Sequence, residues 1–247
     1  MYIAIKFRFW RWLAAAIIAC LLLVFVPLIF TSATEAKVVY LTFDDGPSGV
    51  TPRLLKVLAK HNVKATFFVT GQYEDHFPVL RQIAEEGHLV ALHSYTHDFS
   101  EIYSSTDAFW SDIARLETLI ETETGSRPLP LLRFPGGSSN TVSYRYGGRH
   151  IMDTLVAQCA EKGYAYCDWT IDTRDALGST ISADALCRRV VSGVKNNPVI
   201  VVLMHDGPEQ KTAPEAADAI ITQLKAKGYV FDMVDHLPQA VHHRMPG

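Results

Sequence analysis

The chain has 247 residues, of which 48% are apolar and 20% charged, a composition typical of a globular protein that can bury one good core. From Lys37 onward it carries 20 Lys or Arg against 25 Asp or Glu, a net charge of −5 once Lys6, Arg8, Arg11 and Glu35 are set aside. Because an acidic domain repels nucleic acid and anionic lipid, we expect no nucleic-acid partner.

Residues 1–36 are predicted to form a basic stub followed by a membrane segment. Three basic residues within the first eleven positions precede an uncharged run of 18 residues, 13–30, which is long enough to span most of a bilayer. The basic end is expected in the cytoplasm and everything after residue 36 outside it. The run exceeds the roughly 7 to 15 residues of a signal-peptide core, which favours an uncleaved single-pass anchor. Cleavage after Ala33 or Ala36, with secretion, is the alternative.

Residues 37–247 are predicted to form one domain, because no internal stretch rich in Pro, Gly or Ser is long enough for a linker. Seven apolar runs predict buried strands at 38–43, 65–69, 89–92, 131–134, 165–171, 199–204 and 229–233. Amphipathic patterns predict helices at 52–61, 78–86, 107–121, 149–162, 183–195 and 214–227. Strands that alternate with helices pair in parallel, and this many repeats favour an α/β barrel of about seven strands over an open sheet.

Three cysteines, Cys159, Cys167 and Cys187, lie in this domain. Their odd number and the absence of a Cys-x-x-Cys spacing argue against a zinc knuckle or a redox motif. One disulfide is compatible with an exported domain. Buried apolar thiols are the favoured interpretation, because Cys159 falls in a helical pattern and Cys167 in a strand-like one.

Ionisable residues fall at or just after the ends of five different predicted strands. They are Asp44-Asp45, His93, Arg133, Asp172 with Asp175, and His205-Asp206. In a parallel barrel the carboxyl ends of the strands share one face, which is where active sites lie. Five strands that each deliver such a group to one rim therefore predict an active site.

A metal site is predicted within this set. His93 and His97 are four residues apart, so a turn of chain can aim both imidazoles at one ion, and Asp44-Asp45 adds a hard carboxylate. Two His and one Asp leave open positions on a divalent metal. Such an ion activates water for attack on a carbonyl, and the attack also needs a base, an acid and an oxyanion site.

Five motifs carry a resemblance to a known family. They are Thr42-Phe43-Asp44-Asp45-Gly46-Pro47, His93-Ser94-Tyr95-Thr96-His97, Arg133-Phe134-Pro135-Gly136-Gly137, Asp172-Thr173-Arg174-Asp175 and Leu203-Met204-His205-Asp206. In this order they resemble the polysaccharide deacetylases with NodB homology, carbohydrate esterase family four, and among them the bacterial peptidoglycan N-acetylglucosamine deacetylases. The resemblance implies a distorted (β/α) barrel with fewer than eight complete repeats, in agreement with the seven strands predicted here.

The resemblance also implies a role for each matching ionisable residue. Asp44 would be the general base, held and tuned by Arg133, and His205 would be the general acid, oriented by Asp175. Asp45, His93 and His97 would bind one divalent metal ion. Zinc is the expected ion, with cobalt or nickel as alternatives.

The substrate side of the site follows the family pattern less closely. A backbone N–H near Gly136 would help to stabilise the oxyanion, and Leu203 belongs to the last motif. However, Gly136 stands where many members carry an aromatic residue, and Ala176 stands where many carry Trp. We hypothesise that Trp169, or the loop 138–149 with Tyr144 and Tyr146, restores a sugar-stacking face.

The function expected from these residues is metal-dependent hydrolysis of N-acetyl groups on cell-wall polysaccharide, with peptidoglycan as the expected substrate. O-acetyl ester hydrolysis or deacetylation on xylan, chitin or another glycan is the enzymatic alternative, and a non-catalytic wall-binding homologue is the alternative from another class. The expected location is the outer face of the bacterial plasma membrane or the cell wall, and the expected state is a monomer. For His242 and His243 near the end of the chain, a frayed terminus is the favoured expectation, and contact with a metal is the alternative.

Overall fold

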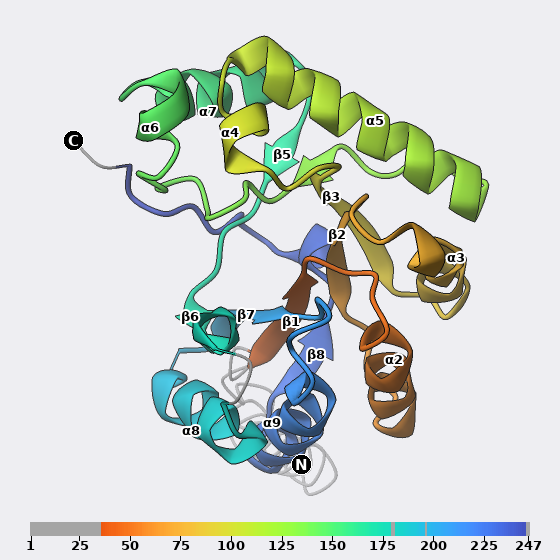
Figure 1. Cartoon of the computed structure of the whole chain (residues 1–247). Coiled ribbons are helices and arrows are strands. Elements are labelled where there is room, and N and C mark those ends of the chain that lie inside the picture. The colour runs from red at the N-terminus through yellow and green to blue at the C-terminus, as the bar shows by residue number, and fades with distance from the viewer. Residues whose placement is uncertain (1–35, 179–180, 196, 246–247) are drawn as a thin grey trace, which may run out of the picture. The chain divides into compact units, whose positions relative to one another are not determined.

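The structure, a computed structural model, describes residues 36–178, 181–195 and 197–245 (Figure 1). Lys37–Gly247 form one compact unit. The predicted membrane segment at 13–30 lies outside the described residues, so it stays a prediction. Within the described part of the chain, no helix combines the length and the apolar character that crossing a bilayer requires.

Parallel strands form the centre of the fold. Within the described residues they pair in the order β5-β4-β3-β2-β1-β7-β6, with β8 on β1. Their bounds are β1 Val38–Asp44, β2 Thr66–Thr70, β3 Leu89–Ser94, β4 Leu131–Leu132, β5 Ala165–Tyr166, β6 Ile171–Asp172, β7 Val199–His205 and β8 Val230–Asp232. The parallel α/β architecture predicted from the alternating pattern is confirmed.

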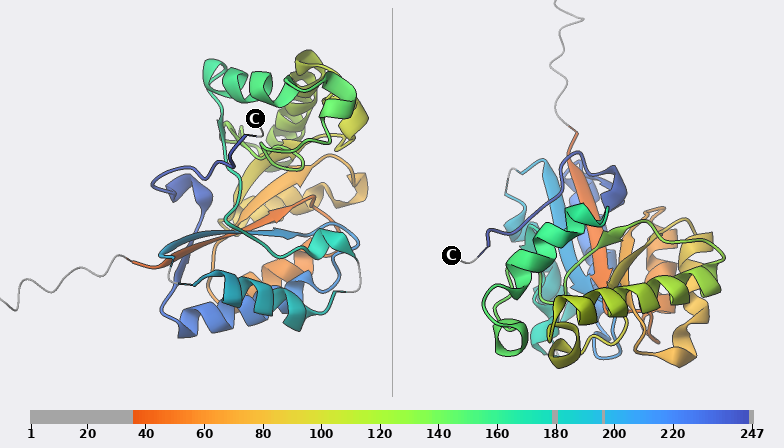
Figure 2. Two further views of the ribbon diagram at one scale, coloured as in Figure 1. Left: turned by 90° about the vertical axis from the view of Figure 1, so that its left-hand side faces the viewer. Right: turned by 90° about the horizontal axis from the view of Figure 1, so that it is seen from above.

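Helices lie on the outer side of the curved sheet (Figures 1 and 2). They are α2 Thr51–Lys60, α3 Pro78–Glu85, α4 Phe99–Ile102, α5 Thr106–Thr124, α6 Tyr144–Gly147, α7 Ile151–Glu161, α8 Ala183–Gly193 and α9 Ala213–Ala226, with 3₁₀ turns η1 Glu74–His76, η2 Asp175–Leu177 and η3 Val234–His236. The six predicted helices correspond to α2, α3, α5, α7, α8 and α9. Left-handed Gly125 caps α5, as its position after the last apolar residue predicts.

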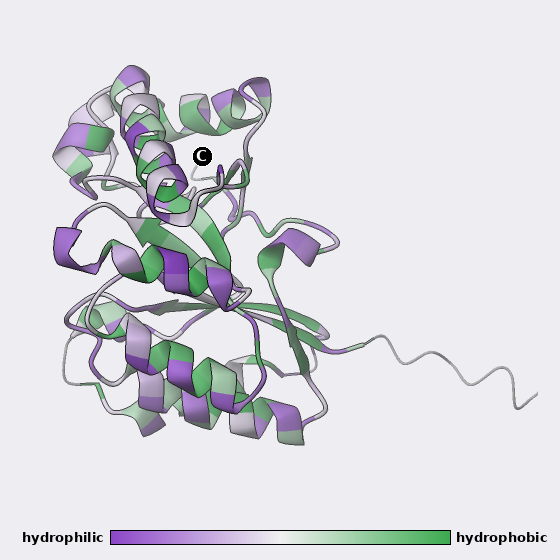
Figure 3. Ribbon diagram, turned by 90° about the vertical axis from the view of Figure 1, so that its right-hand side faces the viewer, coloured by the Kyte–Doolittle hydropathy of each residue, from purple (hydrophilic) through white to green (hydrophobic). Residues whose placement is uncertain are grey.

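The alternation of side chains along β1 separates two apolar layers and positions the site. Val39 and Leu41 face the helices and belong to the larger core cluster. Tyr40 faces inward and joins a small cluster inside the curved sheet. Because successive residues of a strand point to opposite faces, Thr42 and Asp44 share the inner face with Tyr40. Colouring by hydropathy shows that the strands are largely apolar and that the helices are amphipathic (Figure 3).

The predicted strand 165–171 is wrong as a single element, because it divides into β5 and β6. β5 pairs with β4, whereas β6 pairs with β7 at the other end of the sheet. The intervening residues 167–170 cross from one edge of the sheet to the other. The barrel is therefore closed by the covalent chain rather than by a strand pair, which is the distortion in the observed fold. This division gives eight strands among the described residues instead of the predicted seven, and β8, which corresponds to the predicted strand 229–233, pairs with the first half of β1.

The cysteine alternative is resolved in favour of buried thiols. Among the described residues Cys159, Cys167 and Cys187 are buried and free. Burial raises the pKa of Cys159 to about 12, so this thiol is a poor nucleophile at neutral pH.

We expect a Cys20→Ser chain, denatured without reductant, to react with three equivalents of a thiol reagent, one for each free cysteine of the domain. Quantitative Ellman titration measures this number. A single equivalent, rising only after reduction, would show a disulfide and contradict the structure.

Candidate metal centre and acid–base pair

The loop after β1 presents two adjacent carboxylates in different directions. Asp44 ends the strand and is 2% exposed, whereas Asp45 adopts a left-handed backbone with φ 75°. This turn aims its side chain at the end of β3. Gly46 follows, and a Cβ there would lie 2.3 Å from a carboxylate oxygen of Asp206, so the tight loop requires glycine.

Asp45, His93 and His97 converge as the sequence predicts. Asp45 Oδ1 lies 3.5 Å from His93 Nε2 and 3.3 Å from His97 Nε2, and the three ligand atoms lie within 4.8 Å of one another. The buried Oδ1 of Asp45 has no hydrogen-bond partner among the described residues. A buried carboxylate oxygen without a partner is costly unless a cation binds it, so these residues fit a metal ion.

The protonation of His93 also suits metal binding. Its Nδ1 lies 2.7 Å from the carbonyl oxygen of Arg133. A carbonyl only accepts, so Nδ1 carries the hydrogen and leaves the Nε2 lone pair free to bind a metal. Burial lowers the pKa of His97, partly offset by Asp45, and a low pKa favours the neutral, ligating form.

Asp112 on α5 fixes the loop between the two histidines. Its buried carboxylate accepts hydrogen bonds from Ser94 Oγ, Tyr95 N, Thr96 N and Thr96 Oγ1. Ser94 Oγ in turn accepts from the amide of His97. The role of Asp112 was not predicted from the sequence, although a signal exists: an acidic residue falls on the apolar face of a predicted helix, between Phe109 and Ile113.

Arg133 holds Asp44 from inside the barrel. Its guanidinium is fully buried and donates from Nη1 to Asp44 Oδ1 at 2.8 Å and to Thr42 Oγ1 at 2.7 Å. Asp44 Oδ2 faces the metal ligands, 3.9 Å from His93 Nε2. The structure therefore brings the predicted base and its predicted partner together beside the candidate metal site.

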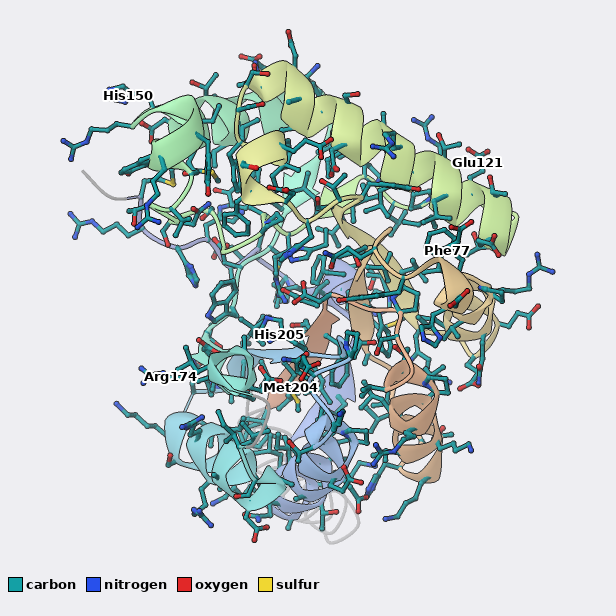
Figure 4. The ribbon with its side chains drawn as sticks, viewed as in Figure 1. Phe77, Glu121, His150, Arg174, Met204 and His205 are labelled. Atoms are coloured by element: carbon teal, nitrogen blue, oxygen red, sulfur yellow. The ribbon has the colours of Figure 1, made fainter. Side chains whose placement is uncertain are left out.

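His205 and Asp175 form the second predicted pair. Asp175 Oδ1 lies 2.7 Å from His205 Nδ1, and its other oxygen accepts the amide of His205. Burial alone would lower the pKa of His205, but the Asp175 hydrogen bond and charge, with Asp45 and Asp44, raise it to about 10. Figure 4 shows His205 and Met204 at the end of β7, in the middle of the fold.

Asp206, one of the ionisable residues at the strand ends, lies behind the loop between β1 and α2. It is completely buried behind the loop of the two carboxylates, where Oδ2 accepts Thr51 Oγ1 and the amide donates to the Asp44 carbonyl. Burial, with the charges of Asp45 and Asp44, raises the pKa of Asp206 to about 7. Asp206 thus supports the β1–α2 loop.

The predicted substrate-side residues lie around the same rim. Gly136 is exposed, with φ 79°, and Gly137 follows with φ 82°. Leu203 is 4% exposed on the inner face of β7, two residues before His205. Trp169 lies against Gly137, where an added Cβ would come within 2.8 Å of its ring. The oxyanion and sugar-stacking roles of these residues stay predictions.

Comparison with known proteins places this geometry in a class. The family described as polysaccharide deacetylase matches residues 31–154. A peptidoglycan-N-acetylglucosamine deacetylase of Bacillus cereus is 36% identical over 202 residues, covering 80% of this chain and 69% of that protein. The catalytic domain of such an enzyme from Eubacterium rectale superposes with a TM-score of 0.82 at 40% identity, covering 88% of this chain and 97% of that one.

A third relative binds a metal. A family 4 acetyl xylan esterase of Clostridium thermocellum, solved with a cobalt ion, superposes with a TM-score of 0.65 at 29% identity, covering 81% of this chain and 90% of that one. The fold and the comparisons therefore define a carbohydrate deacetylase. The chain belongs to the polysaccharide deacetylase family.

We expect Asp112→Asn to weaken zinc binding by about 10- to 100-fold, because the loop between His93 and His97 loses acceptors that orient it. Calorimetric titration of the metal-free chain with zinc measures the affinity. Glu121→Gln, an exposed change on the same helix, is the matched control. An affinity equal to that of the control would contradict the support role of Asp112.

Proposed function

We propose that the protein is a metal-dependent deacetylase that hydrolyses N-acetyl groups of peptidoglycan. The observation that carries the proposal is the placement of the Asp44–Arg133 pair and the His205–Asp175 pair at the rim that also holds Asp45 and the two histidines. A base and an acid beside a metal site are the parts that amide hydrolysis needs.

Asp45, His93 and His97 would hold the ion, since their ligand atoms are close together. A bound divalent cation would act as a Lewis acid toward water and the acetyl carbonyl. Two imidazoles and one carboxylate suit zinc, cobalt or nickel. Zinc is the proposed ion.

Asp44 would take the proton from the attacking water. Arg133 occupies Asp44 Oδ1 and leaves Oδ2 directed to the metal side, so the carboxylate is oriented before the substrate binds. Such pre-organisation avoids reorganisation during the reaction. The amide of Gly136, on the exposed turn after Arg133, is proposed to donate to the developing oxyanion.

His205 would give a proton to the leaving amine nitrogen. Because Asp175 holds Nδ1, the proton on Nε2 is the one available for transfer. Protonation of the amine prevents the tetrahedral intermediate from expelling the water oxygen instead, and so commits it to loss of the amine.

The proposed substrate is the N-acetylglucosamine of peptidoglycan, and the relatives at 36% and 40% identity support it. Ester hydrolysis on an acetylated glycan is the second candidate, favoured by the similarity to the acetyl xylan esterase. We further propose that residues 13–30 anchor a monomeric domain to the outer face of the plasma membrane, next to the wall; a secreted form is the alternative.

Acetate release from purified peptidoglycan tests metal, base and substrate together. We expect release that depends on added zinc or cobalt, that stops with a chelator, and that falls by about 10²- to 10⁴-fold in Asp44→Asn because the general base is lost. Asp153→Asn, an exposed change on α7, should retain activity. If a metal-loaded chain released no acetate from peptidoglycan and yet cleaved an O-acetyl glycan, the ester alternative would replace the proposal.

The pH dependence tests the acid. His205 is active when protonated, and its raised pKa keeps it protonated until pH rises toward about 10. Asp175→Asn removes the main contribution that raises this pKa, so we expect the alkaline limb of kcat/KM to move to lower pH. Profiles measured at saturating metal show the shift. An unmoved alkaline limb would exclude His205 as the group that sets it.

A further inference from the structure

The segment 237–245 packs against the barrel, which corrects the expectation that His242 and His243 fray. Leu237 and Val241 contact the inner apolar cluster, and Met245 contacts the outer core. Figure 2 shows this segment, in dark blue, beside the connection between β5 and β6. It covers the place where the sheet has no strand pair.

Backbone and side-chain hydrogen bonds join this segment to residues 168–169. The amide of Asp168 donates to the Val241 carbonyl at 2.8 Å. The amide of His243 donates to Asp168 Oδ2 at 2.7 Å, and His243 Nε2 donates to the carbonyl of Trp169 at 2.9 Å. The flanking strands bond to the connection through the amides of Cys167 and Thr170, so the C-terminal segment is one of the supports of its middle residues, 168–169.

Asp168 extends this connection to the turn that carries Gly136. Its carboxylate is fully buried and accepts the amide of Ser138 at 2.9 Å and Ser138 Oγ at 2.5 Å. The Trp169 ring lies against Gly137 on one side and meets the His243 ring edge-on, with 4.5 Å between centroids. A side chain larger than hydrogen at residue 137 would collide with this indole.

Cys167 and Asp168 of this connection also hold Arg133, the partner of the proposed base. Arg133 Nε donates to the Cys167 carbonyl at 2.9 Å and Nη2 to the Asp168 carbonyl at 3.0 Å. The remaining nitrogen, Nη1, donates to Asp44. A shift of the 167–169 backbone therefore moves the guanidinium that orients the proposed base.

We propose that His243 is a positioning residue of the active site: by holding Asp168 and Trp169 it fixes the carbonyls that bind Arg133 and the turn at Gly136–Gly137. The proposal rests on the proposed function, because the reaction is what Arg133 and Asp44 are positioned for. His243 touches neither Asp44 nor the metal ligands and acts through its neighbours.

His243→Ala removes the bond to Trp169 and the edge contact, whereas His243→Gln can place an amide N–H near the Nε2 position. His242→Ala is the matched control, because exposed His242 stacks on Tyr166 and bonds its carbonyl. We expect kcat on acetylated glycan to fall by about 10-fold in His243→Ala, with KM and zinc affinity unchanged. His243→Gln should recover most of kcat, and His242→Ala should retain it.

Amide hydrogen exchange of peptides spanning 133–140 and 166–170 measures the order of these segments independently of any activity assay. Faster exchange in His243→Ala but not in His242→Ala supports the positioning role, whether or not the chain releases acetate. If the unsubstituted chain released no acetate, that result would refute only the proposed function. If His243→Ala lowered the Tm but left kcat and the hydrogen-exchange rates of these peptides unchanged, the proposal would be overturned. Segment 237–245 would then contribute only to stability. Equal losses in His242→Ala and His243→Ala would overturn it as well.

Discussion

Arg133 is the largest of the fully buried side chains, and the site is built around satisfying its charge. A guanidinium in a protein interior is strongly destabilising unless its N–H groups are paired. Asp44 and Thr42 of β1 and the carbonyls of Cys167 and Asp168 supply the acceptors. The Phe68 ring lies 4.1 Å from the guanidinium carbon and adds a cation–π contact. One buried charge thus fixes β1, β4 and the crossing between β5 and β6 relative to one another.

Buried hydrogen bonds of the same kind hold the loops that carry the candidate site residues. Asp45 and His97 sit on loops, whereas His93 lies in β3, and loops alone position side chains poorly. Here each loop is fixed by a buried carboxylate: Asp112 holds the loop between the histidines, Asp206 lies behind the Asp44–Asp45 turn, and Asp168 holds the turn at Ser138. These carboxylates surround the site without belonging to the predicted acid–base set, and their hydrogen bonds define its geometry.

Local patterns in the sequence predict the parallel α/β fold and the convergence of Asp44, Asp45, His93, His97, Arg133, Asp175 and His205. Both follow from strand and helix periodicity and from the rule that parallel strands end on one face. The division of 165–171 is not predictable locally, because an apolar run does not show which strand each half pairs with. The packing of His243 depends likewise on contacts far away in sequence. Asp112 is an intermediate case, since its place on an apolar helix face is visible while its partners are not.

Asp45, His93 and His97 are proposed to bind one divalent ion beside the Asp44–Arg133 pair. X-ray absorption spectroscopy of the zinc-loaded chain, combined with its metal stoichiometry, tests this most directly. We expect one ion per chain, with two imidazole nitrogens and oxygen ligands, and loss of that signature in His97→Ala. No stoichiometric ion, sulfur ligation, or an unchanged spectrum in His97→Ala would contradict it.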